Sequence, residues 1–240
     1  MKSSESLSIV IPAYNEEHRL HSTFRALDEF LARSLFVNID VVFVNDGSTD
    51  QTSKILKSYK SIAPVRILEY SPNRGKGYAV TTGMLVATGD YALMTDADMS
   101  TPFDQIEKFL PLMKEGVAVL VGNRRIKGSQ LEKSQPWIRR SMGRCYTILA
   151  NIITGVPVSD FTCGFKIFSK EARQKVFTKT KIERWSYDTE ILYLARKAGY
   201  SIMEIPVRWI NDEGTRVNLW KDTIRSFTDL FRIRFGKYDL

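Results

Sequence analysis

The sequence contains few of the residues that build disulfide scaffolds or histidine-based metal sites. Its 240 residues include only two cysteines and two histidines. Cys145 and Cys163 form no C-x-x-C pair, which favours a reducing compartment. His18 and His21 lack the partner pattern of a metal site, and we expect both to be exposed helix residues. The sequence therefore gives no sign of a disulfide framework or a histidine cluster.

Long hydrophobic runs are lacking as well. The N-terminal segment MKSSESLSIVIPAYNEE has an apolar run of about five residues, which is too short for the core of a signal peptide. The longest uncharged stretch, Cys145 to Ser159, is interrupted by Asn151, Gly155 and Pro157. A spanning helix needs about 20 apolar residues. We therefore expect no segment that crosses a membrane, although one can still lie on a membrane surface.

Linkers rich in Pro, Gly or Ser, low-complexity tracts and internal repeats are also absent, so we expect a single domain over residues 1–240. The composition, with 43% hydrophobic and 26% charged residues, is that of an ordinary globular protein. No Ser-His-Asp or Cys-His arrangement is recognisable, and we expect Cys163 to pack in the core rather than act as a nucleophile.

Positive charge is in excess. The net charge is +8 and the sequence pI is about 9.4, which favours an acidic partner. Nucleic acid, anionic lipid headgroups and a phosphorylated small molecule all meet this condition. The charge alone does not choose among them.

The first half alternates short β-branched runs with helical patterns. We expect strands at residues 7–14, 39–46, 65–70 and 90–98, and helices at residues 16–34, 49–62 and 77–89. Continuous apolar strands separated by helices predict an α/β fold with a mostly parallel twisted sheet and helices on both faces.

The second half is less regular. We expect strands at residues 117–125, 160–169 and 201–211, a loop at 125–135, and helices at 136–154 and 187–199. A basic amphipathic helix is expected at about 218–235, with Trp220, Ile224, Phe227 and Phe231 at helical spacing. Such a stripe is typical of a helix that docks on the core, and its cations leave a membrane-surface role open.

Two carboxylates follow the apolar run Tyr91–Met94, namely Asp96 and Asp98. Ligands bind beyond the carboxyl ends of parallel strands. Two like charges there repel and resist burial, so we expect a positive group between them. On an extended strand both would lie on the same side and could share a hard divalent cation. The alternative is a turn with solvated carboxylates.

Two more loops are expected at the same edge. The segment NRGKGYAVTTG resembles a phosphate-binding loop without the P-loop spacing, and Lys76 in it could neutralise a phosphate. A simple helix-entry turn is the alternative. The segment VNDGSTD is also compatible with an Asp-Gly turn capped by Ser48 or Thr49. The first strand leads into Pro12, Ala13, Tyr14, Asn15 and Glu16.

The segments SIVIPAYNEE, VNDGSTDQT, NRGKGYAVTTGM and DADMSTP occur in that order. Together they resemble the family-2 inverting glycosyltransferases, which use nucleotide-sugar donors. The later segments DFTCGFKIFS, ERWSYDTEILYLARKAGY and EIPVRWINDEGTR look like the polyprenyl-phosphate branch. Within that branch the dolichyl-phosphate glucosyltransferases come first and the dolichol-phosphate mannose synthases second. The resemblance covers residues 7–238.

The resemblance implies a single nucleotide-sugar-transferase (GT-A type) domain that uses Mg²⁺ or Mn²⁺. It implies that Asp98 holds the metal and that Asp96 reaches the diphosphate region. Ser100 stands where the mannose synthases commonly have a Gln, and it is a weaker metal ligand, which favours the glucosyl branch. Asp46 is expected to contact the nucleobase. The other donor-binding candidates are Pro12, Ala13, Tyr14, Glu16, Lys76, Ala97 and Arg216.

The implied reaction is inverting, metal-dependent transfer of a hexose from a nucleotide sugar to a polyprenyl phosphate. UDP-glucose is the favoured donor and GDP-mannose the alternative. Arg124, Arg140 and Arg216 are candidates to hold phosphates, because guanidinium groups match phosphate geometry. Asp188 is a candidate catalytic carboxylate, although an acceptor phosphate is already anionic and makes a strong base unnecessary.

A lipid acceptor would place the enzyme at the cytoplasmic face of a membrane, either directly or through a membrane-protein partner. Residues 136–154 and the C-terminal helix could lie on the bilayer. Their apolar candidates are Trp137, Ile138, Met142, Tyr146, Leu149, Trp220, Ile224, Phe227 and Phe231.

Two other classes of function are possible from the composition, an inactive binding protein and a nucleic-acid binder. Intact Asp46, Asp96 and Asp98 argue against an inactive nucleotide-sugar-binding protein. The lack of a recognised basic-aromatic module argues against a nucleic-acid binder.

Overall fold

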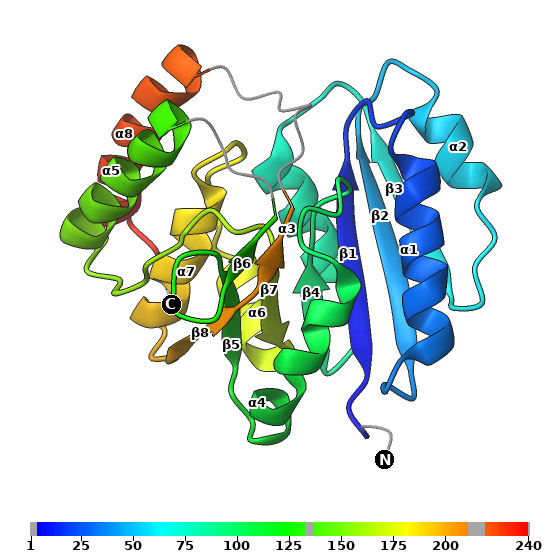
Figure 1. Ribbon diagram of the computed structural model, residues 1–240. Coiled ribbons are helices and arrows are strands. Elements are labelled where there is room, and N and C mark those ends of the chain that lie inside the picture. Colours follow the sequence, from blue (N-terminus) through cyan, green and yellow to red (C-terminus); the bar gives the residue numbers. More distant parts are fainter. Residues whose placement is uncertain (1–3, 133–136, 211–218, 240) are drawn as a thin grey trace.

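A seven-stranded sheet forms the centre of the protein in the computed structural model, which describes residues 4–132, 137–210 and 219–239. The strand order is β3-β2-β1-β4-β7-β5-β8. The strands are β1 (Leu7–Ala13), β2 (Ile39–Asp46), β3 (Val65–Tyr70), β4 (Tyr91–Met94), β5 (Val119–Asn123), β7 (Lys166–Ser169) and β8 (Ile202–Pro206). Helices cover both faces of this sheet (Figure 1).

The sheet is mostly parallel, as the alternation of strands and helices predicted. β1 pairs in parallel with β2 and β4, β2 with β3, and β5 with β8. β7 alone runs against its neighbours, because it pairs antiparallel with both β4 and β5. The parallel half therefore carries its carboxyl ends to one edge of the sheet.

Alternate residues of β1 enter two separate hydrophobic layers. Ile9 and Ile11 belong to one core cluster, and Val10 belongs to the other, as the period of two in a strand requires. The Ile9 side is covered by α1 (Leu20–Arg33), α2 (Thr52–Ser58), the 3-10 helix η1 (Phe103–Lys108) and α4 (Leu110–Lys114). The Val10 side is covered by α3 (Lys76–Val86), α5 (Trp137–Thr154), α6 (Lys170–Phe177), α7 (Tyr187–Lys197) and α8 (Leu219–Phe235).

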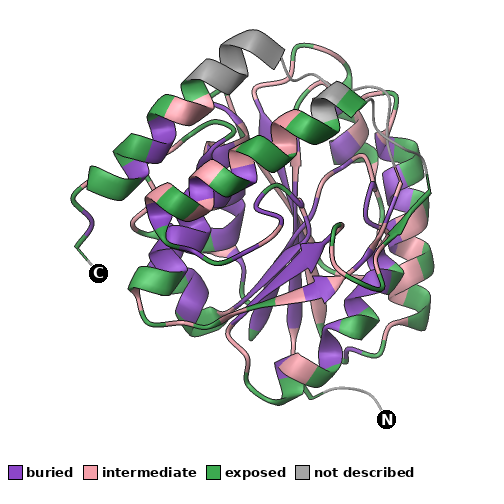
Figure 2. Ribbon diagram, turned by 60° about the vertical axis from the view of Figure 1, so that its left-hand side comes forward, coloured by how far each residue is buried: buried purple, intermediate pink, exposed green. Residues whose placement is uncertain are grey.

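Figure 2 shows this layering directly, with a buried sheet and helices whose outer sides are exposed. Burial on both faces explains why the strand sequences are continuously apolar. Within the described ranges, no helix combines the length and the apolar character that a membrane span requires.

Several strands are shorter than the sequence pattern predicted. The strand expected at 90–98 ends at Met94, because the chain then turns, with φ of 54° at Met99 and its N–H donating to Asp96 O at 3.3 Å. Only Lys166–Ser169 of the strand expected at 160–169 is extended. The strand expected at 201–211 divides at Val207 into β8 and a two-residue strand β9 (Arg208–Trp209). β9 pairs with β6 (Gln130–Leu131), which lies in the stretch predicted as a loop.

The helices of the first half also differ from their predicted bounds. The helix expected from residue 16 begins at Leu20, because residues 16–19 form a turn closed by Arg19 N–H and Glu16 O at 2.9 Å. The helices expected at 49–62 and 77–89 lie at Thr52–Ser58 and Lys76–Val86. Three helices were not predicted, namely η1, α4 and α6.

A glycine fixes how closely α3 approaches the sheet. A Cβ atom at Gly83 would lie 2.4 Å from Val10 Cγ1 and 2.9 Å from Val44 Cγ2. We predict that Gly83→Ala lowers the free energy of unfolding by about 1–3 kcal/mol, because overpacking forces backbone or side-chain shifts. Denaturant unfolding measures this change. The control is Leu85→Ala in the same helix, which is 46% exposed and should change the value by at most about 0.5 kcal/mol. Equal effects of the two substitutions would contradict the prediction.

Candidate active site

Charged side chains from three separate elements meet at the carboxyl edge of the parallel strands, the upper edge in Figure 1. The loop after β4 carries Asp96 and Asp98, α3 begins with Lys76, and Asp188 lies in the first turn of α7. The close approach of α3 and α7 depends on Gly77, where a Cβ atom would lie 2.7 Å from the Cβ of Tyr187. The edge predicted from the strand ends therefore brings three carboxylates and a lysine together.

Lys76 is the cation nearest the paired carboxylates. Its Nζ lies 2.5 Å from Asp96 Oδ1, and it lies 5.9 Å from the centroid of the Trp185 ring. Burial opposes the charged form of Lys76, but the negative charges of Asp96 and of the two other site carboxylates outweigh it. The pKa of Lys76 is therefore raised, and the side chain is a fixed positive charge at the start of α3.

The sequence analysis expected Asp96 and Asp98 to lie on one side of an extended strand. This expectation is wrong. They belong to the turn that follows β4, because the strand ends at Met94. They still interact, since burial first and then the charge of Asp96 raise the pKa of Asp98. Ser100 N–H donates to Asp98 Oδ1 at 2.9 Å. The turn thus holds a carboxylate pair under mutual repulsion.

These residues fit a small divalent cation that also takes ligands from a substrate. No group of three or more His, Cys, Asp or Glu side chains that could hold an ion occurs in the part of the chain that the structure describes. Asp96, Asp98 and Ser100 offer oxygen atoms, and Mg²⁺ is commonly bound by one or two carboxylates together with phosphate oxygens and water. A cation there would also relieve the excess negative charge that raises the pKa of Asp98.

A glycine that the sequence analysis did not single out allows a second loop to reach this turn. A Cβ atom at Gly164 would lie 2.2 Å from Asp96 Oδ2, well inside van der Waals contact. Gly164 lies in the segment 160–165, which was predicted as a strand and instead forms a loop against the site. The sequence CGF offered only a weak signal, because the contact joins residues 68 positions apart.

Asp46 at the end of β2 anchors the loop between β3 and α3. Its Oδ1 accepts a hydrogen bond from Arg74 N–H at 2.8 Å, and its Oδ2 accepts from Gly75 N–H at 2.9 Å and Asn73 Nδ2 at 2.7 Å. Gly75 has φ of 111°, a conformation that only glycine adopts without strain. Asp46 therefore shapes the phosphate-type loop, and its expected contact with a nucleobase stays a prediction.

The other predicted donor residues lie along the end of β1 and in the neighbouring turns. Pro12 and Ala13 are the last residues of β1, and Tyr14 is 37% exposed just beyond it. Glu16 pairs with Arg19 at 3.0 Å. Ala97 is buried, and its carbonyl accepts a hydrogen bond from Thr23 Oγ1 at 2.6 Å. All five lie in or next to the strands and turns that form the site edge.

The structure gives Arg124 an anionic partner within the protein. Its Nε and Nη2 donate to the two oxygens of the fully buried Asp160, each at 2.7 Å, and its guanidinium lies 5.3 Å from the Trp209 ring. Burial alone would raise the pKa of Asp160, but the Arg124 guanidinium lowers it to about 2. Arg124 is therefore held in a bidentate ion pair, and its predicted role in phosphate binding would have to use the remaining guanidinium surface.

The two other arginines proposed as phosphate ligands are not drawn into the site by any described contact. Arg140 is exposed in the first turn of α5. Arg216 lies outside the described residues. Among the described residues, Lys76 is therefore the predicted phosphate-binding cation that lies beside the carboxylate pair.

Asp188 forms a buried ion pair that the sequence analysis did not foresee. Lys166 in β7 has no exposed surface, and its Nζ donates to Asp188 Oδ1 and, at 2.6 Å, to the carbonyl of Cys163. Burial raises the pKa of Asp188, although the positive charges of Lys166 and Lys76 oppose that rise. The apolar surroundings of Lys166 in GFKIF were the only sequence sign of a buried lysine.

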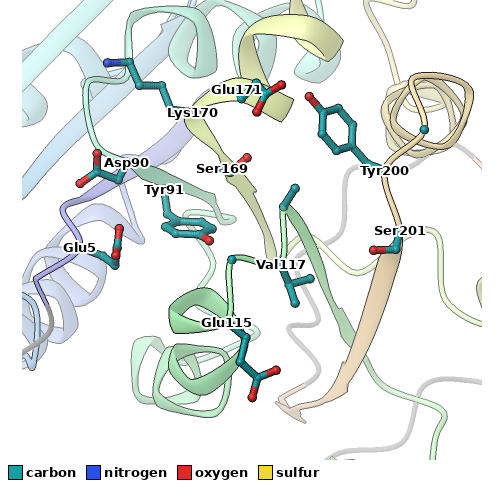
Figure 3. Close-up of a pocket in the computed structure, with 13 residues that line it drawn as sticks. Glu5, Asp90, Tyr91, Glu115, Val117, Ser169, Lys170, Glu171, Tyr200 and Ser201 are labelled. Carbon is teal, nitrogen blue, oxygen red and sulfur yellow. The ribbon is translucent and has the colours of Figure 1, made fainter.

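A hollow of about 620 Å³ lies at the opposite end of the sheet. It is lined by residues before β1 and β8, at the start of β4 and after β7, including Glu5, Asp90, Tyr91, Lys170 and Tyr200 (Figure 3). Asp90 accepts hydrogen bonds from the backbone N–H and the hydroxyl of Ser6. Because parallel α/β sheets bind ligands at the carboxyl ends of their strands, we assign the function to the other edge.

Comparison with known proteins shows which proteins this chain is similar to. The model of the family "Glycosyl transferase family 2" matches residues 8–177. Proteins named dolichyl-phosphate beta-glucosyltransferase are similar over most of the chain. That of Dictyostelium discoideum is 34% identical over 95% of this chain and 74% of its own length. That of Saccharomyces cerevisiae is 34% identical over 96% and 74%, and that of Homo sapiens is 31% identical over 96% and 75%.

Two solved structures of synthases have the same fold. Glucosyl-3-phosphoglycerate synthase from Mycobacterium tuberculosis in complex with UDP matches with a TM-score of 0.68 over 95% of this chain and 80% of that one, at 18% identity. Mannosyl-3-phosphoglycerate synthase from Rubrobacter xylanophilus matches with a TM-score of 0.71 over 95% and 74%, at 16% identity. At these identities the likeness establishes the GT-A type fold and nothing finer.

The buried ion pair yields a prediction about stability. We expect Lys166→Met to lower the free energy of unfolding by about 3–5 kcal/mol, because Asp188 would be left buried without its partner. The double variant Lys166→Met/Asp188→Asn removes both charges and should recover most of that loss. Denaturant unfolding of the three proteins measures both effects. A double variant as unstable as Lys166→Met would show that packing, not charge, dominates.

Proposed function

The chain belongs to glycosyl transferase family 2, and from this premise we propose that it transfers glucose from UDP-glucose to dolichyl phosphate or a related polyprenyl phosphate. The names of its relatives, which are 31% to 34% identical over nearly the whole chain, support the sugar and the acceptor. The choice of UDP rests on the resemblance to the glucosyl branch, including Ser100. GDP-mannose is the alternative donor.

One observation carries the proposal: Lys76 Nζ lies 2.5 Å from Asp96, at the start of α3 and beside Asp98. A cation, a helix N-terminus and two carboxylates with oxygen ligands are the parts needed to hold a diphosphate with its metal ion. They lie at the edge of the sheet where ligands of parallel α/β folds bind.

In the proposed reaction, an oxygen of the acceptor phosphate forms a bond to the anomeric carbon of glucose. The bond from that carbon to the β-phosphate oxygen of UDP breaks, UDP leaves with the electron pair, and the configuration inverts. Negative charge grows on the leaving diphosphate, and Lys76 and the N–H groups at the start of α3 stabilise it. To reach the diphosphate, Lys76 would exchange Asp96 for a phosphate oxygen.

A bound Mg²⁺ or Mn²⁺ would supply further positive charge to the diphosphate oxygens. Asp98 would hold it, with Asp96 and Ser100 as the other oxygen donors of this chain. Asp188 acts as part of the charge framework through Lys166, because the acceptor phosphate is already an anion and needs no strong base.

We also propose that the protein works as a peripheral protein on the cytoplasmic face of the membrane that contains its lipid acceptor, directly or with a membrane-protein partner. A nucleic-acid partner is not part of this proposal, since three carboxylates gather at the site edge. An inactive binding protein is disfavoured because Asp46, Asp96 and Asp98 are all present.

The first test is a donor and acceptor panel. We expect the pure protein with Mg²⁺ or Mn²⁺ and polyprenyl phosphate to form a glucolipid from UDP-glucose, detected by mass spectrometry. Because recognition of the wrong base leaves polar groups unpaired, other nucleotide sugars should react at least about 100-fold more slowly. Transfer from GDP-mannose alone would support the mannosyl alternative, and absence of both transfer and donor hydrolysis would support a binding protein.

The second test concerns the metal. We expect Asp98→Asn to lower kcat/KM by about 100- to 1,000-fold, because an amide loses the charge attraction to a divalent cation. Folding should persist, since removing a carboxylate with a raised pKa relieves repulsion with Asp96. Steady-state kinetics and thermal unfolding measure the two effects. The matched control is Asp104→Asn, whose side chain is 57% exposed and which should keep wild-type rates.

Asp188→Asn should reduce transfer less than Asp98→Asn does, because its role is to position charge rather than to hold the metal. An equal or larger loss at matched folding would make Asp188 a catalytic carboxylate.

The metal dependence has a direct test as well. Undiminished turnover of the native protein in excess chelator would exclude metal dependence.

A further inference from the structure

Two helices lie side by side on one flank of the molecule (Figures 1 and 2). They are α5 and α8, and they meet through Tyr146 and Phe227, whose ring centroids are 6.3 Å apart. Their inner residues, such as Ala150 and Leu230, are buried in the same core cluster. The opposite sides of both helices therefore face away from the protein, and we call them together the α5–α8 face.

On α5 this face combines cations with large apolar side chains. Arg140, Arg144, Ile148 and Ile152 follow each other at four-residue spacing, which places neighbours on the same side of a helix. Ile148 is 59% exposed and Ile152 is 74% exposed. Trp137, at the beginning of α5, is 75% exposed. Among the residues that the structure describes, none covers these apolar surfaces.

On α8 the same combination recurs. Phe231 is 55% exposed and Phe235 is 75% exposed, again at four-residue spacing. Arg232 and Arg234 are exposed between them, and the guanidinium of Arg234 lies 6.0 Å from the Phe235 ring. Of the apolar residues expected to lie on the bilayer, Trp137 and Phe231 are exposed, whereas Tyr146, Leu149 and Phe227 are partly buried and pack on the core. The side chains of Ile138, Trp220 and Ile224 lie outside the described residues.

The exposed charges on the described part of the α5–α8 face have one sign. α5 contains no Asp or Glu, and the described carboxylate of α8, Asp229, is only 2% exposed and is paired with Arg232. Cations next to exposed aromatic and aliphatic side chains, on a helix that does not span, are typical of segments that lie in the headgroup region of an anionic membrane.

We propose that the α5–α8 face docks on an anionic lipid bilayer, with Ile148, Ile152, Phe231 and Phe235 entering the headgroup boundary and the arginines contacting lipid phosphates. The biological need for docking rests on the proposed lipid acceptor, but the face itself is defined by exposure and charge. α5 is about 27 Å long. It begins near the upper edge of Figure 1, so the first turn of α5 is the part of the α5–α8 face that lies nearest the site edge.

The test is co-sedimentation of the chain with vesicles of phosphatidylcholine alone or with about 30% phosphatidylserine added as the anionic lipid. We expect binding only to the anionic vesicles and a loss of binding at high salt, because screening weakens the cation contacts. Arg144→Gln/Arg234→Gln should weaken binding about 30-fold. Ile152→Ser/Phe235→Ser should also weaken it, with less dependence on salt, because it removes apolar insertion.

A matched control carries the same kinds of substitution on another flank. Lys54→Gln/Lys60→Gln/Ile62→Ser alters exposed residues near α2, of which Ile62 is 77% exposed, and should bind like the native chain. Native binding by both face variants, or no binding of the native chain to anionic vesicles at low salt, would overturn the proposal. A lipid-free dimer that the Ile152→Ser/Phe235→Ser variant dissociates would instead assign the face to a second copy.

The binding assay contains neither donor nor acceptor, so it stands or falls independently of the proposed reaction. Where transfer is observed, both face variants should be impaired with acceptor embedded in anionic vesicles and unimpaired with a short-chain, water-soluble acceptor phosphate. Loss of transfer with both acceptors would mean that these residues act on the site rather than on docking.

Discussion

Charge balance at the carboxyl edge of the sheet is the constraint on which the site depends. The site is buried, so unpaired charge in it is costly. Electrostatic interactions there link Lys76 to the three carboxylates Asp96, Asp98 and Asp188. Lys76 offsets Asp96, and Lys166 offsets Asp188. Asp98 has no comparable ion pair among the described residues, and burial together with the charge of Asp96 raises its pKa. The arrangement is therefore suited to a further cation, because Lys76 and Lys166 already pair with the other two carboxylates.

Close backbone approach makes this charge cluster possible. Asp46 ties down the loop that delivers Lys76, Gly77 lets α3 meet α7, and Gly164 lets the loop before β7 reach Asp96. A side chain at either glycine would force the charged elements apart. The same elements are anchored in two buried hydrophobic layers, so the positions of the charges follow from packing rather than from their mutual attraction.

Features local in sequence were predictable, and features that join distant segments were not. Strand–helix alternation predicted the parallel sheet, and the strand ends predicted that the polar residues after Ala13, Asp46, Tyr70 and Met94 would lie at one edge of it. The geometry of the carboxylate pair was mispredicted, because an apolar run does not reveal where a strand turns. The Lys166–Asp188 and Arg124–Asp160 pairs span 22 and 36 positions, and hydrophobic periodicity carries no information about such partners.

The distribution of charge separates two explanations of the basic composition. If the net charge of +8 served mainly to attract a phosphorylated donor, the excess cations would gather at the carboxyl edge of the sheet. There, however, carboxylates of the chain oppose Lys76, Lys166 and Arg124. Arg140, Arg144 and Arg234, which form no ion pair with the described residues, lie instead on the α5–α8 face, beside exposed apolar side chains. Long-range attraction is strongest where cations lack internal partners, so the basic character of the chain is better matched to an extended anionic surface than to its small-molecule substrate.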